Sequence, residues 1–113
     1  MSVEKFSRIF DGLKEAYGTF RIEKKQSNGK SAGKAAIIRE PRTKATFKSH
    51  LKGEVSIGVV PINEDNVCIW GAIDIDQYPL DHALIIRNIL KHKLPLVVCR
   101  SKSGGAHLFL FFK

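Results

Sequence analysis

The strongest candidates for chemistry in this sequence are two aspartates at the end of an apolar run. Residues 67–75 are almost wholly apolar and rich in β-branched side chains, which is typical of a strand buried on both faces, and Asp74 and Asp76 come at its end. Alternate residues of a strand share a face, so both carboxylates point the same way, roughly 6–7 Å apart at the backbone. Two convergent acids predict a site for a hard divalent cation, Mg²⁺ or Mn²⁺. The alternative is a plain turn, since aspartate commonly begins turns.

The segment 100–107 is the second candidate, because it combines cations, hydroxyls and glycines. Arg100, Lys102 and Ser103 can all bind phosphate oxygens, and the adjacent glycines let the backbone approach a ligand and form an anion-binding nest. His107 follows at the start of an apolar strand. Taken alone, the segment is better explained as a Gly-Gly turn with an incidental histidine. Beside two acids on a neighbouring strand, it predicts a nucleotide site.

Positive charge is concentrated in one third of the chain. The net charge is +8 at pH 7, the pI is about 9.7, and most of the excess lies within residues 21–52. This distribution favours a polyanionic partner, either nucleic acid or a nucleoside triphosphate. The alternative is a charged surface that keeps the protein in solution. The side chains predicted to bind nucleic acid are Lys24, Lys25, Lys30, Lys34, Arg39 and Arg42.

These candidates require a scaffold of helices and strands, which the spacing of apolar residues predicts. Helices are expected at 3–17, 43–52 and 80–92, and strands at 19–22, 35–39, 54–62, 67–76, 94–99 and 107–112. The short connection between the strands at 54–62 and 67–76 predicts that they form an antiparallel hairpin. We expect an α+β fold in which helices pack on a central mixed or antiparallel sheet, and a single domain spanning residues 1–113.

The cysteines and the hydropathy indicate the cellular compartment in which the protein works. Cys68 and Cys99 fall inside predicted strands without metal-ligand spacing, so we expect buried, reduced thiols. No apolar run approaches the ~20 residues of a membrane span, and no signal peptide precedes the first helix. We therefore expect a cytoplasmic protein with no membrane partner.

Taken together, the motifs resemble those of the archaeo-eukaryotic primase superfamily, the primase-polymerases. Residues 72–76 match its hydrophobic-Asp-hydrophobic-Asp motif, and residues 103–108 match its Ser-Gly-x-x-His-hydrophobic motif. Segments 10–17, 50–53 and 57–61 look like the branch found in phage primases and in TOTE conflict systems. The resemblance spans nearly the whole chain and depends on the order and spacing of its motifs.

The resemblance implies a primase or DNA-directed polymerase, a nucleotidyltransferase of DNA replication. Asp74 and Asp76 would coordinate Mg²⁺ or Mn²⁺ and, with His107, would be the catalytic residues. Ser103 and His107 would contact the phosphates of the incoming nucleoside triphosphate, joined by Arg100 and Lys102, and single-stranded or primer-template nucleic acid would be the second substrate. Other replication proteins are further candidate partners, in a bacterial or phage-infected cell.

One departure from the family pattern concerns a third acid. The superfamily places a further carboxylate on a strand well beyond the histidine motif, whereas this sequence ends at Lys113, six residues after His107. We therefore expect the chain to be incomplete relative to the full catalytic module. It would be either the N-terminal part of a longer primase-polymerase or a minimal relative that binds without efficient catalysis.

Two alternatives from other functional classes stay open. His107, Phe109 and Phe111 alternate along one strand and loosely resemble the base-stacking strand of an RNA-recognition domain. Asp74 and Asp76 argue against this alternative, because a stacking platform gains nothing from acids that repel phosphate. The other alternative is a small phage protein that binds a host factor.

Overall fold

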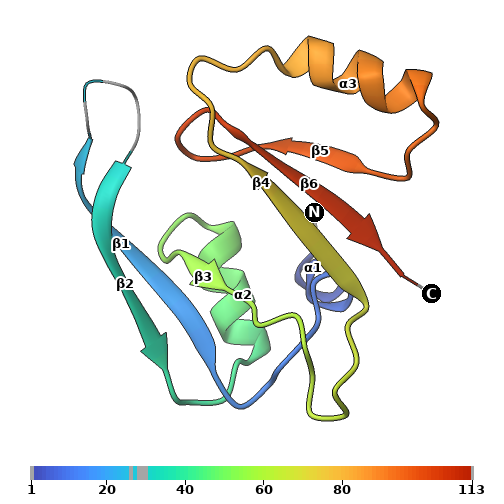
Figure 1. Cartoon of the computed structure of the whole chain (residues 1–113). Helices are drawn as coiled ribbons and strands as arrows, with labels where there is room; N and C mark the ends of the chain where they lie inside the picture. Colours follow the sequence, from blue (N-terminus) through green and yellow to red (C-terminus); the bar gives the residue numbers. More distant parts are fainter. Residues whose placement is uncertain (1, 26, 28–30, 113) are drawn as a thin grey trace.

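The fold was obtained as a computed structural model, which describes residues 2–25, 27 and 31–112. Within these residues, three helices accompany two three-stranded antiparallel sheets, which confirms the predicted α+β class (Figure 1). The single central sheet expected from the sequence is replaced by two separate sheets. No helix in the described part of the chain is both long and apolar enough to cross a bilayer.

The elements follow one another in a simple order. They are α1 (Val3–Ile9), β1 (Tyr17–Lys25), β2 (Ser31–Ile38), α2 (Lys44–Leu51), β3 (Ile57–Gly58), β4 (Trp70–Ile75), α3 (His82–Lys91), β5 (Val97–Arg100) and β6 (Ala106–Phe111). The strand order is β2-β1-β3 in the first sheet and β4-β6-β5 in the second. The predicted helices at 43–52 and 80–92 and the predicted strands at 94–99 and 107–112 are therefore confirmed, with shifts of a few residues at their ends.

Helix α1 is shorter than the predicted helix at 3–17, which is wrong beyond Ile9. Phe10 is the C-cap, and the chain then turns where the Asp11 carboxylate accepts a hydrogen bond from the Gly12 N–H at 2.9 Å. The Leu13 N–H donates to the Val60 carbonyl at 2.9 Å instead of to a helical carbonyl. This long-range hydrogen bond draws the chain out of the helix and into β1.

The predicted hairpin between residues 54–62 and 67–76 is also wrong. Only β3 forms in the first segment, and it pairs with β1, while β4 pairs with β6. The connection does turn tightly, because Asn63 donates its N–H to the Val67 carbonyl and its side chain accepts from the N–H groups of Asp65 and Val67. The turn is therefore local and does not extend into a ladder.

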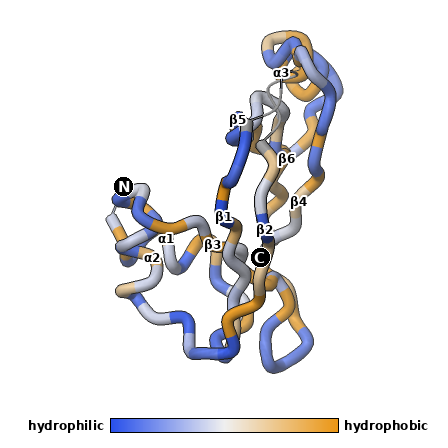
Figure 2. The backbone as a smooth tube through the Cα atoms, turned by 90° about the vertical axis from the view of Figure 1, so that its left-hand side faces the viewer, coloured by the Kyte–Doolittle hydropathy of each residue, from blue (hydrophilic) through white to orange (hydrophobic). Residues whose placement is uncertain are grey.

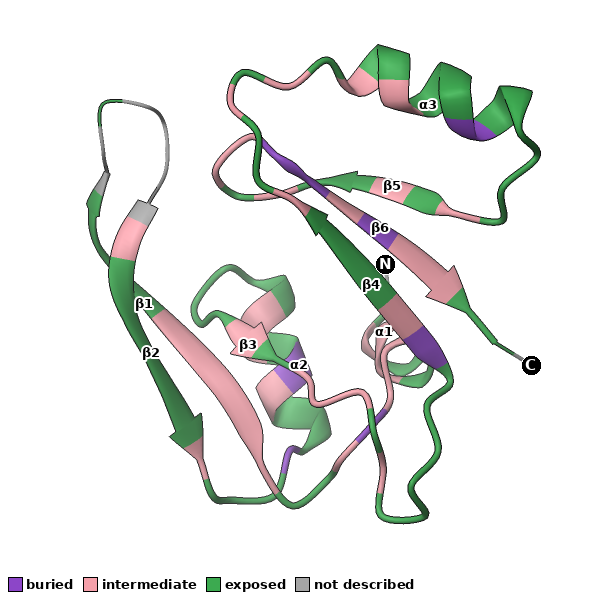
Figure 3. Ribbon diagram, in the orientation of Figure 1, coloured by how far each residue is buried: buried purple, intermediate pink, exposed green. Residues whose placement is uncertain are grey.

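Strand β4 is an edge strand, which contradicts the prediction that it is buried on both faces. Trp70 is buried, but Ala72, Ile73 and Asp74 are exposed, and Ile73 keeps 55% of its surface in contact with solvent (Figure 3). β4 has a hydrogen-bonded neighbour on one side only, so side chains of a further strand do not help to cover its faces there. Its acidic end therefore stays hydrated and avoids the cost of burying a charge.

The two faces of the second sheet pack against different parts of the chain. On one face, α3 covers a core formed by Ile89, Ala106 and Leu108 together with partly buried Ile75, Leu80, Ile85, Leu96 and Val98. On the other face, the Phe10 ring lies 5.5 Å from Trp70, 5.1 Å from Phe109 and 5.7 Å from Phe111, measured between ring centroids. In the side view, α1 and α2 lie on one side of the first sheet, and β4 and β6 lie on the other (Figure 2).

Both cysteines are free, and the prediction that they are buried is wrong. Cys68 precedes β4 in an exposed segment, and Cys99 is exposed on β5, the other edge of the second sheet.

Candidate functional site

The second sheet brings the first acid and the motif histidine together. Asp74 on β4 and His107 on β6 are direct cross-strand partners, so their side chains share a face of the sheet. The His107 Nε2 atom lies 3.2 Å from the Asp74 Oδ1 atom, and the two side chains keep 44% and 65% of their surfaces exposed. The pair is thus formed by strand register and remains accessible to a ligand.

Tyr78, which sequence reasoning treated only as part of a turn, links the second acid to the glycine-containing segment. Its hydroxyl donates to the Asp76 Oδ1 atom at 3.2 Å and also hydrogen-bonds to Ser103. Partial burial raises the pKa of Tyr78, and the negative charges of Asp76 and Asp74 raise it further. Asp76 and Ser103 therefore meet at the Tyr78 hydroxyl, while Asp74 contacts His107. A tyrosine two residues after the acidic motif was the sequence signal that could have identified it.

Two glycines shape the segment 100–107, each for its own reason. Gly104 has a φ of +92°, which a side chain disfavours, and its N–H donates to the Ser101 carbonyl at 3.1 Å. At Gly105, an added Cβ would overlap the Ile75 carbonyl oxygen of β4. The Ser101 N–H donates back to the Gly105 carbonyl at 3.1 Å, which closes the turn. Because the turn itself occupies these two N–H groups, they are not available to the predicted anion-binding nest.

Helix α3 fixes this turn through a histidine that sequence reasoning did not single out. The His82 Nε2–H donates to the Gly105 carbonyl at 2.8 Å, and His82 is the first residue of α3. The helix begins there because the Asp81 side chain accepts a hydrogen bond from the Leu84 N–H at 3.1 Å. The turn is therefore held between the end of β4 and the start of α3.

An open hollow of about 400 Å³ lies beside this turn. Its lining residues are Ser27, Tyr78, Pro79, Leu80, Arg100, Ser103 and Gly104. Arg100 pairs with Ala106, one position away from His107, so it lies on the opposite face of the sheet from the Asp74–His107 pair. Tyr78 therefore lies between the hollow, which Arg100 and Ser103 line, and Asp76, which follows the end of β4.

Lys102 was predicted to contact phosphate, but its side chain packs against an aromatic ring. Its Nζ atom lies 3.2 Å from the centroid of the Phe20 ring on β1, in a cation–π contact. Burial lowers the pKa of the Lys102 amine. The ammonium group thus joins the segment 100–107 to the β1–β2 hairpin.

Arg42 is part of the fold, and this corrects its assignment as a nucleic-acid contact. Its guanidinium group is almost fully buried, forms an ion pair with Asp11 at 2.8 Å and donates to the Leu13 carbonyl at 3.1 Å. The guanidinium carbon also lies 4.8 Å from the centroid of the Phe47 ring. A cation enclosed in this way is not presented to a polyanion.

The other predicted nucleic-acid contacts divide into two groups. Lys24, Lys34 and Arg39 are exposed. Lys30 and the side chain of Lys25 lie outside the part of the chain that the structure describes.

The acids supply suitable ligands for a hard cation but do not enclose one by themselves. The described residues contain no group of three histidine, cysteine or acidic side chains that could hold a metal ion. Asp74 and Asp76 nevertheless offer exposed carboxylate oxygens. Mg²⁺ is commonly bound by one or two carboxylates with water and substrate phosphates completing its shell, so this donor set fits a cation that binds together with a triphosphate.

The base-stacking alternative conflicts with the packing of the aromatic side chains. His107, Phe109 and Phe111 do share one face, and the His107 and Phe109 ring centroids are 5.9 Å apart. However, Phe10 packs edge-on against both phenylalanines, and Trp70 packs against Phe109 at 6.0 Å. Phe109 and Phe111 are therefore engaged by Phe10 and Trp70, although His107 and Phe111 on this face keep exposed surface.

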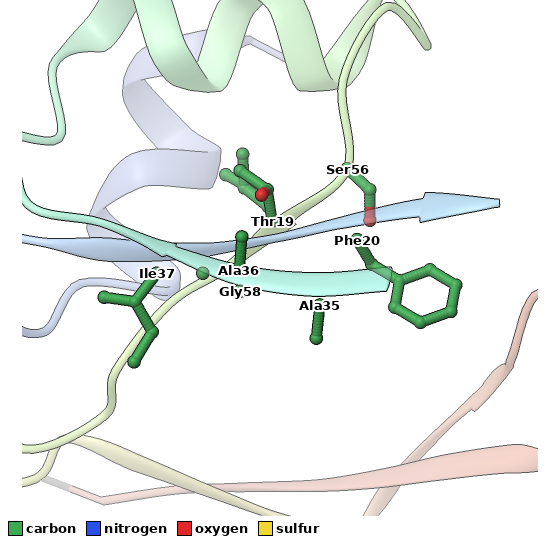
Figure 4. Close-up of a pocket in the computed structure, with 9 residues that line it drawn as sticks. Thr19, Phe20, Ala35, Ala36, Ile37, Ser56 and Gly58 are labelled. Carbon is green, nitrogen blue, oxygen red and sulfur yellow. The ribbon is translucent and has the colours of Figure 1, made fainter. Parts of the chain in front are cut away.

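A second hollow, of about 490 Å³, crosses the first sheet and carries no ionisable side chain (Figure 4). It is lined by Gly18, Thr19, Phe20, Ala35, Ala36, Ile37, Ser56, Ile57 and Gly58. With only two hydroxyls among these residues, it offers no group for acid–base or metal chemistry.

Comparison with known proteins agrees with the motifs of the site. A family model described as "TOTE conflict system, Archaeo-Eukaryotic Primase domain" matches residues 10–113. No curated protein and no solved structure matches the chain. The matched range contains both acids, Tyr78 and the whole of the segment 100–107.

Proposed function

Because the chain belongs to the archaeo-eukaryotic primase family of TOTE conflict systems, we propose that it binds a nucleoside triphosphate and a divalent cation around Tyr78 and takes part in nucleotidyl transfer. The family match supports the primase-polymerase class as a whole. One observation supports this location more than any other. The Tyr78 hydroxyl contacts Asp76 and Ser103, so the acidic motif and the serine of the second motif meet at one point.

Asp74 and Asp76 would hold Mg²⁺ or Mn²⁺, with water and phosphate oxygens as the remaining ligands. A divalent cation here would neutralise triphosphate charge and make a 3′-hydroxyl easier to deprotonate. Asp74 has a second task, because it also contacts the His107 Nε2 atom at 3.2 Å and thereby fixes the orientation of the imidazole ring.

Arg100, Ser103 and His107 would contact the triphosphate. Arg100 and Ser103 line a hollow of about 400 Å³, which lies in the range of small-molecule sites. His107 lies on the other face of the sheet beside Asp74 and would contact the phosphates from the side of the acids. Arg100 would supply charge and paired N–H donors, and Ser103 a hydroxyl already oriented by Tyr78. Lys102 would position the turn against Phe20 and would not itself bind phosphate.

Single-stranded or primer-template nucleic acid would be the other substrate, and Lys24, Lys34 and Arg39 are its proposed contacts among the described side chains. Lys25 and Lys30 belong to the same predicted set. These substrates would be met in the cytoplasm of a bacterial or phage-infected cell, together with other replication proteins.

The test is direct binding of a deoxynucleoside triphosphate, measured by calorimetry with and without Mn²⁺. We expect Mn²⁺-dependent binding that is at least about tenfold weaker in the Asp74→Asn, Asp76→Asn double variant, since a tenfold change corresponds to only 1.4 kcal/mol. Asp65→Asn, which removes an exposed carboxylate at a distant turn, is the matched control and should bind normally. Equal affinity in the double variant and the control would refute the site.

A further inference from the structure

The two faces of the β1–β2 hairpin differ in chemistry. Strand register places Phe20 opposite Ala35, and Arg21 opposite Lys34. Side chains of the Phe20 face extend toward the second sheet, where Phe20 meets Lys102, whereas Thr19 and Ala36 extend to the other side (Figure 4). Because side chains alternate along a strand, Arg21 and Lys34 lie on the same side as Thr19 and Ala36. The apolar face thus points toward the candidate nucleotide site, and the charged face points away from it.

A β-bulge adds a third cation to the charged face. Ile22 pairs with Gly33 and Lys24 pairs with Ala32, so Glu23 is an extra residue in β1. In a regular strand, Lys24 would lie three residues from Arg21 and on the opposite face. The extra residue shifts the alternation by one and places Lys24 on the same face as Arg21 and Lys34.

The resulting cationic face, defined as Arg21, Lys24 and Lys34, carries uncompensated charge. Directly opposed like charges, about 5 Å apart at Cβ, destabilise a strand pair. All three side chains are exposed, and no ion pair within the described residues involves any of them. Lys24 lies about two residue steps, roughly 7 Å, further along the strand. An anion with repeated negative charges would relieve this repulsion at more than one point.

We propose that the cationic face binds the sugar–phosphate backbone of a single-stranded polynucleotide, as a holding surface separate from the nucleotide site. Helices α1 and α2 lie on the same side of the sheet as Thr19 and Ala36, whereas Arg21, Lys24 and Lys34 are exposed further along the hairpin (Figures 2 and 4). Since the face points away from Tyr78 and the acids, it would bind a part of the polynucleotide that is remote from its reacting end. This inference rests on the proposed function, which already gives Lys24 and Lys34 as nucleic-acid contacts, and it adds Arg21, the bulge and a location away from the nucleotide site.

The first test is a salt titration of binding to fluorescein-labelled dT25 and U25, followed by anisotropy. Each phosphate contact to a single strand contributes about 0.7 to the slope of log K against log salt, so Arg21→Ala, Lys24→Ala, Lys34→Ala should reduce the slope by about 2. The control Lys5→Ala, Arg87→Ala, Lys91→Ala removes the same charge from α1 and α3 and should leave the slope nearly unchanged. Equal effects of both triple variants, or no effect of either, would overturn the proposal.

The second test addresses the bulge without changing charge. Insertion of one threonine between Ala32 and Gly33 gives Glu23 a cross-strand partner and returns Lys24 to the Phe20 face. We expect the slope to fall by at least about 0.7, because Lys24 leaves the cationic face and the Glu23 carboxylate joins it. A slope equal to that of the unaltered chain, with a circular dichroism spectrum showing an intact fold, would contradict the role given to the bulge.

Nucleotide binding separates the two proposals. The Arg21→Ala, Lys24→Ala, Lys34→Ala variant should bind a deoxynucleoside triphosphate with Mn²⁺ as the unaltered chain does, because the cationic face lies on the other side of the hairpin. The Asp74→Asn, Asp76→Asn variant should keep the full salt slope for dT25. Loss of dT25 binding in that variant would mean that the oligonucleotide binds at Asp74 and Asp76, and it would refute a separate holding surface.

Discussion

The Asp74 and His107 side chains lie directly opposite each other on β4 and β6, with Oδ1 and Nε2 separated by 3.2 Å. Two motifs that are far apart in the chain thus become neighbours through a single strand pairing. Because β4 is an edge strand, the pair is formed without burying the carboxylate. The other acid is then connected to the serine motif through Tyr78, so the site depends on side-chain bridges as much as on the strands.

Tyr78→Phe tests that bridge. Removal of the hydroxyl eliminates hydrogen bonds to Asp76 and Ser103, and a net hydrogen bond contributes about 1 kcal/mol, so nucleotide affinity should fall about 3- to 10-fold. Since the pKa of Tyr78 is raised, the hydroxyl stays protonated as a donor throughout the neutral range. Calorimetric titration with a triphosphate and Mn²⁺ measures the change. Tyr17→Phe, on β1, is the control, and an equal loss there would show a nonspecific effect.

Acid should weaken the contribution of the Asp11–Arg42 pair to stability. Burial by itself raises the pKa of Asp11, but the hydrogen bonds from Arg42 and Gly12 and nearby positive charge outweigh it, so the pKa is lowered below 3.8. The carboxylate therefore stabilises the fold fully above about pH 4–5, and this contribution is lost as the pH falls through the folded pKa. Urea unfolding should show that Asp11→Asn is less stable than the unaltered chain at pH 7 and that the difference shrinks below pH 4. A constant difference would contradict the ion pair.

Substitution by alanine should destabilise the fold more at Gly104 and Gly105, in the turn, than at Gly71 in β4. In Gly105→Ala the new methyl group would overlap the backbone carbonyl of Ile75, which should cost about 1–3 kcal/mol. Gly104→Ala should cost about 1–2 kcal/mol, because its φ of +92° is unfavourable for a side chain. Gly71→Ala meets only the Phe112 ring at 3.8 Å and should be neutral or slightly stabilising. Thermal melting ranks the three, and equal stability of the Gly105 and Gly71 variants would refute the packing argument.

Primer extension by these 113 residues should be slow at best. Asp74 and Asp76 are the acids of the site, and the described residues assemble no group of three ligands around a metal. A lost ligand can remove several kcal/mol of transition-state stabilisation, and each ~1.4 kcal/mol is tenfold in rate. The assay compares the chain with its Asp74→Ala, Asp76→Ala variant, using dNTPs or rNTPs with Mg²⁺ or Mn²⁺. Rapid extension that the variant abolishes would mean that another group completes the site.

Local patterns in the sequence were sufficient for the α+β class, for α2 and α3, and for the two motifs. Apolar spacing and capping residues such as Asp81 act over a few residues, and their physical effect does not depend on distant parts of the chain. The motif residues could be selected in the same way, because a pair of acids and a glycine turn have recognisable chemistry before folding.

Tertiary structure alone decided which strands pair and which side chains remain available. The apolar run that ends at Asp74 has the composition of a buried strand, yet pairing with β6 on one side only leaves it at an edge. Arg42 has the same charge as Lys34, but its guanidinium is enclosed by Asp11 while Lys34 stays exposed. Periodicity determines the face on which a side chain lies, but not which neighbour covers that face. The covering neighbour depends on hydrogen bonds between segments far apart in the chain. Even the face itself can change, because one unpaired residue such as Glu23 moves the next side chain, Lys24, to the other face of the strand.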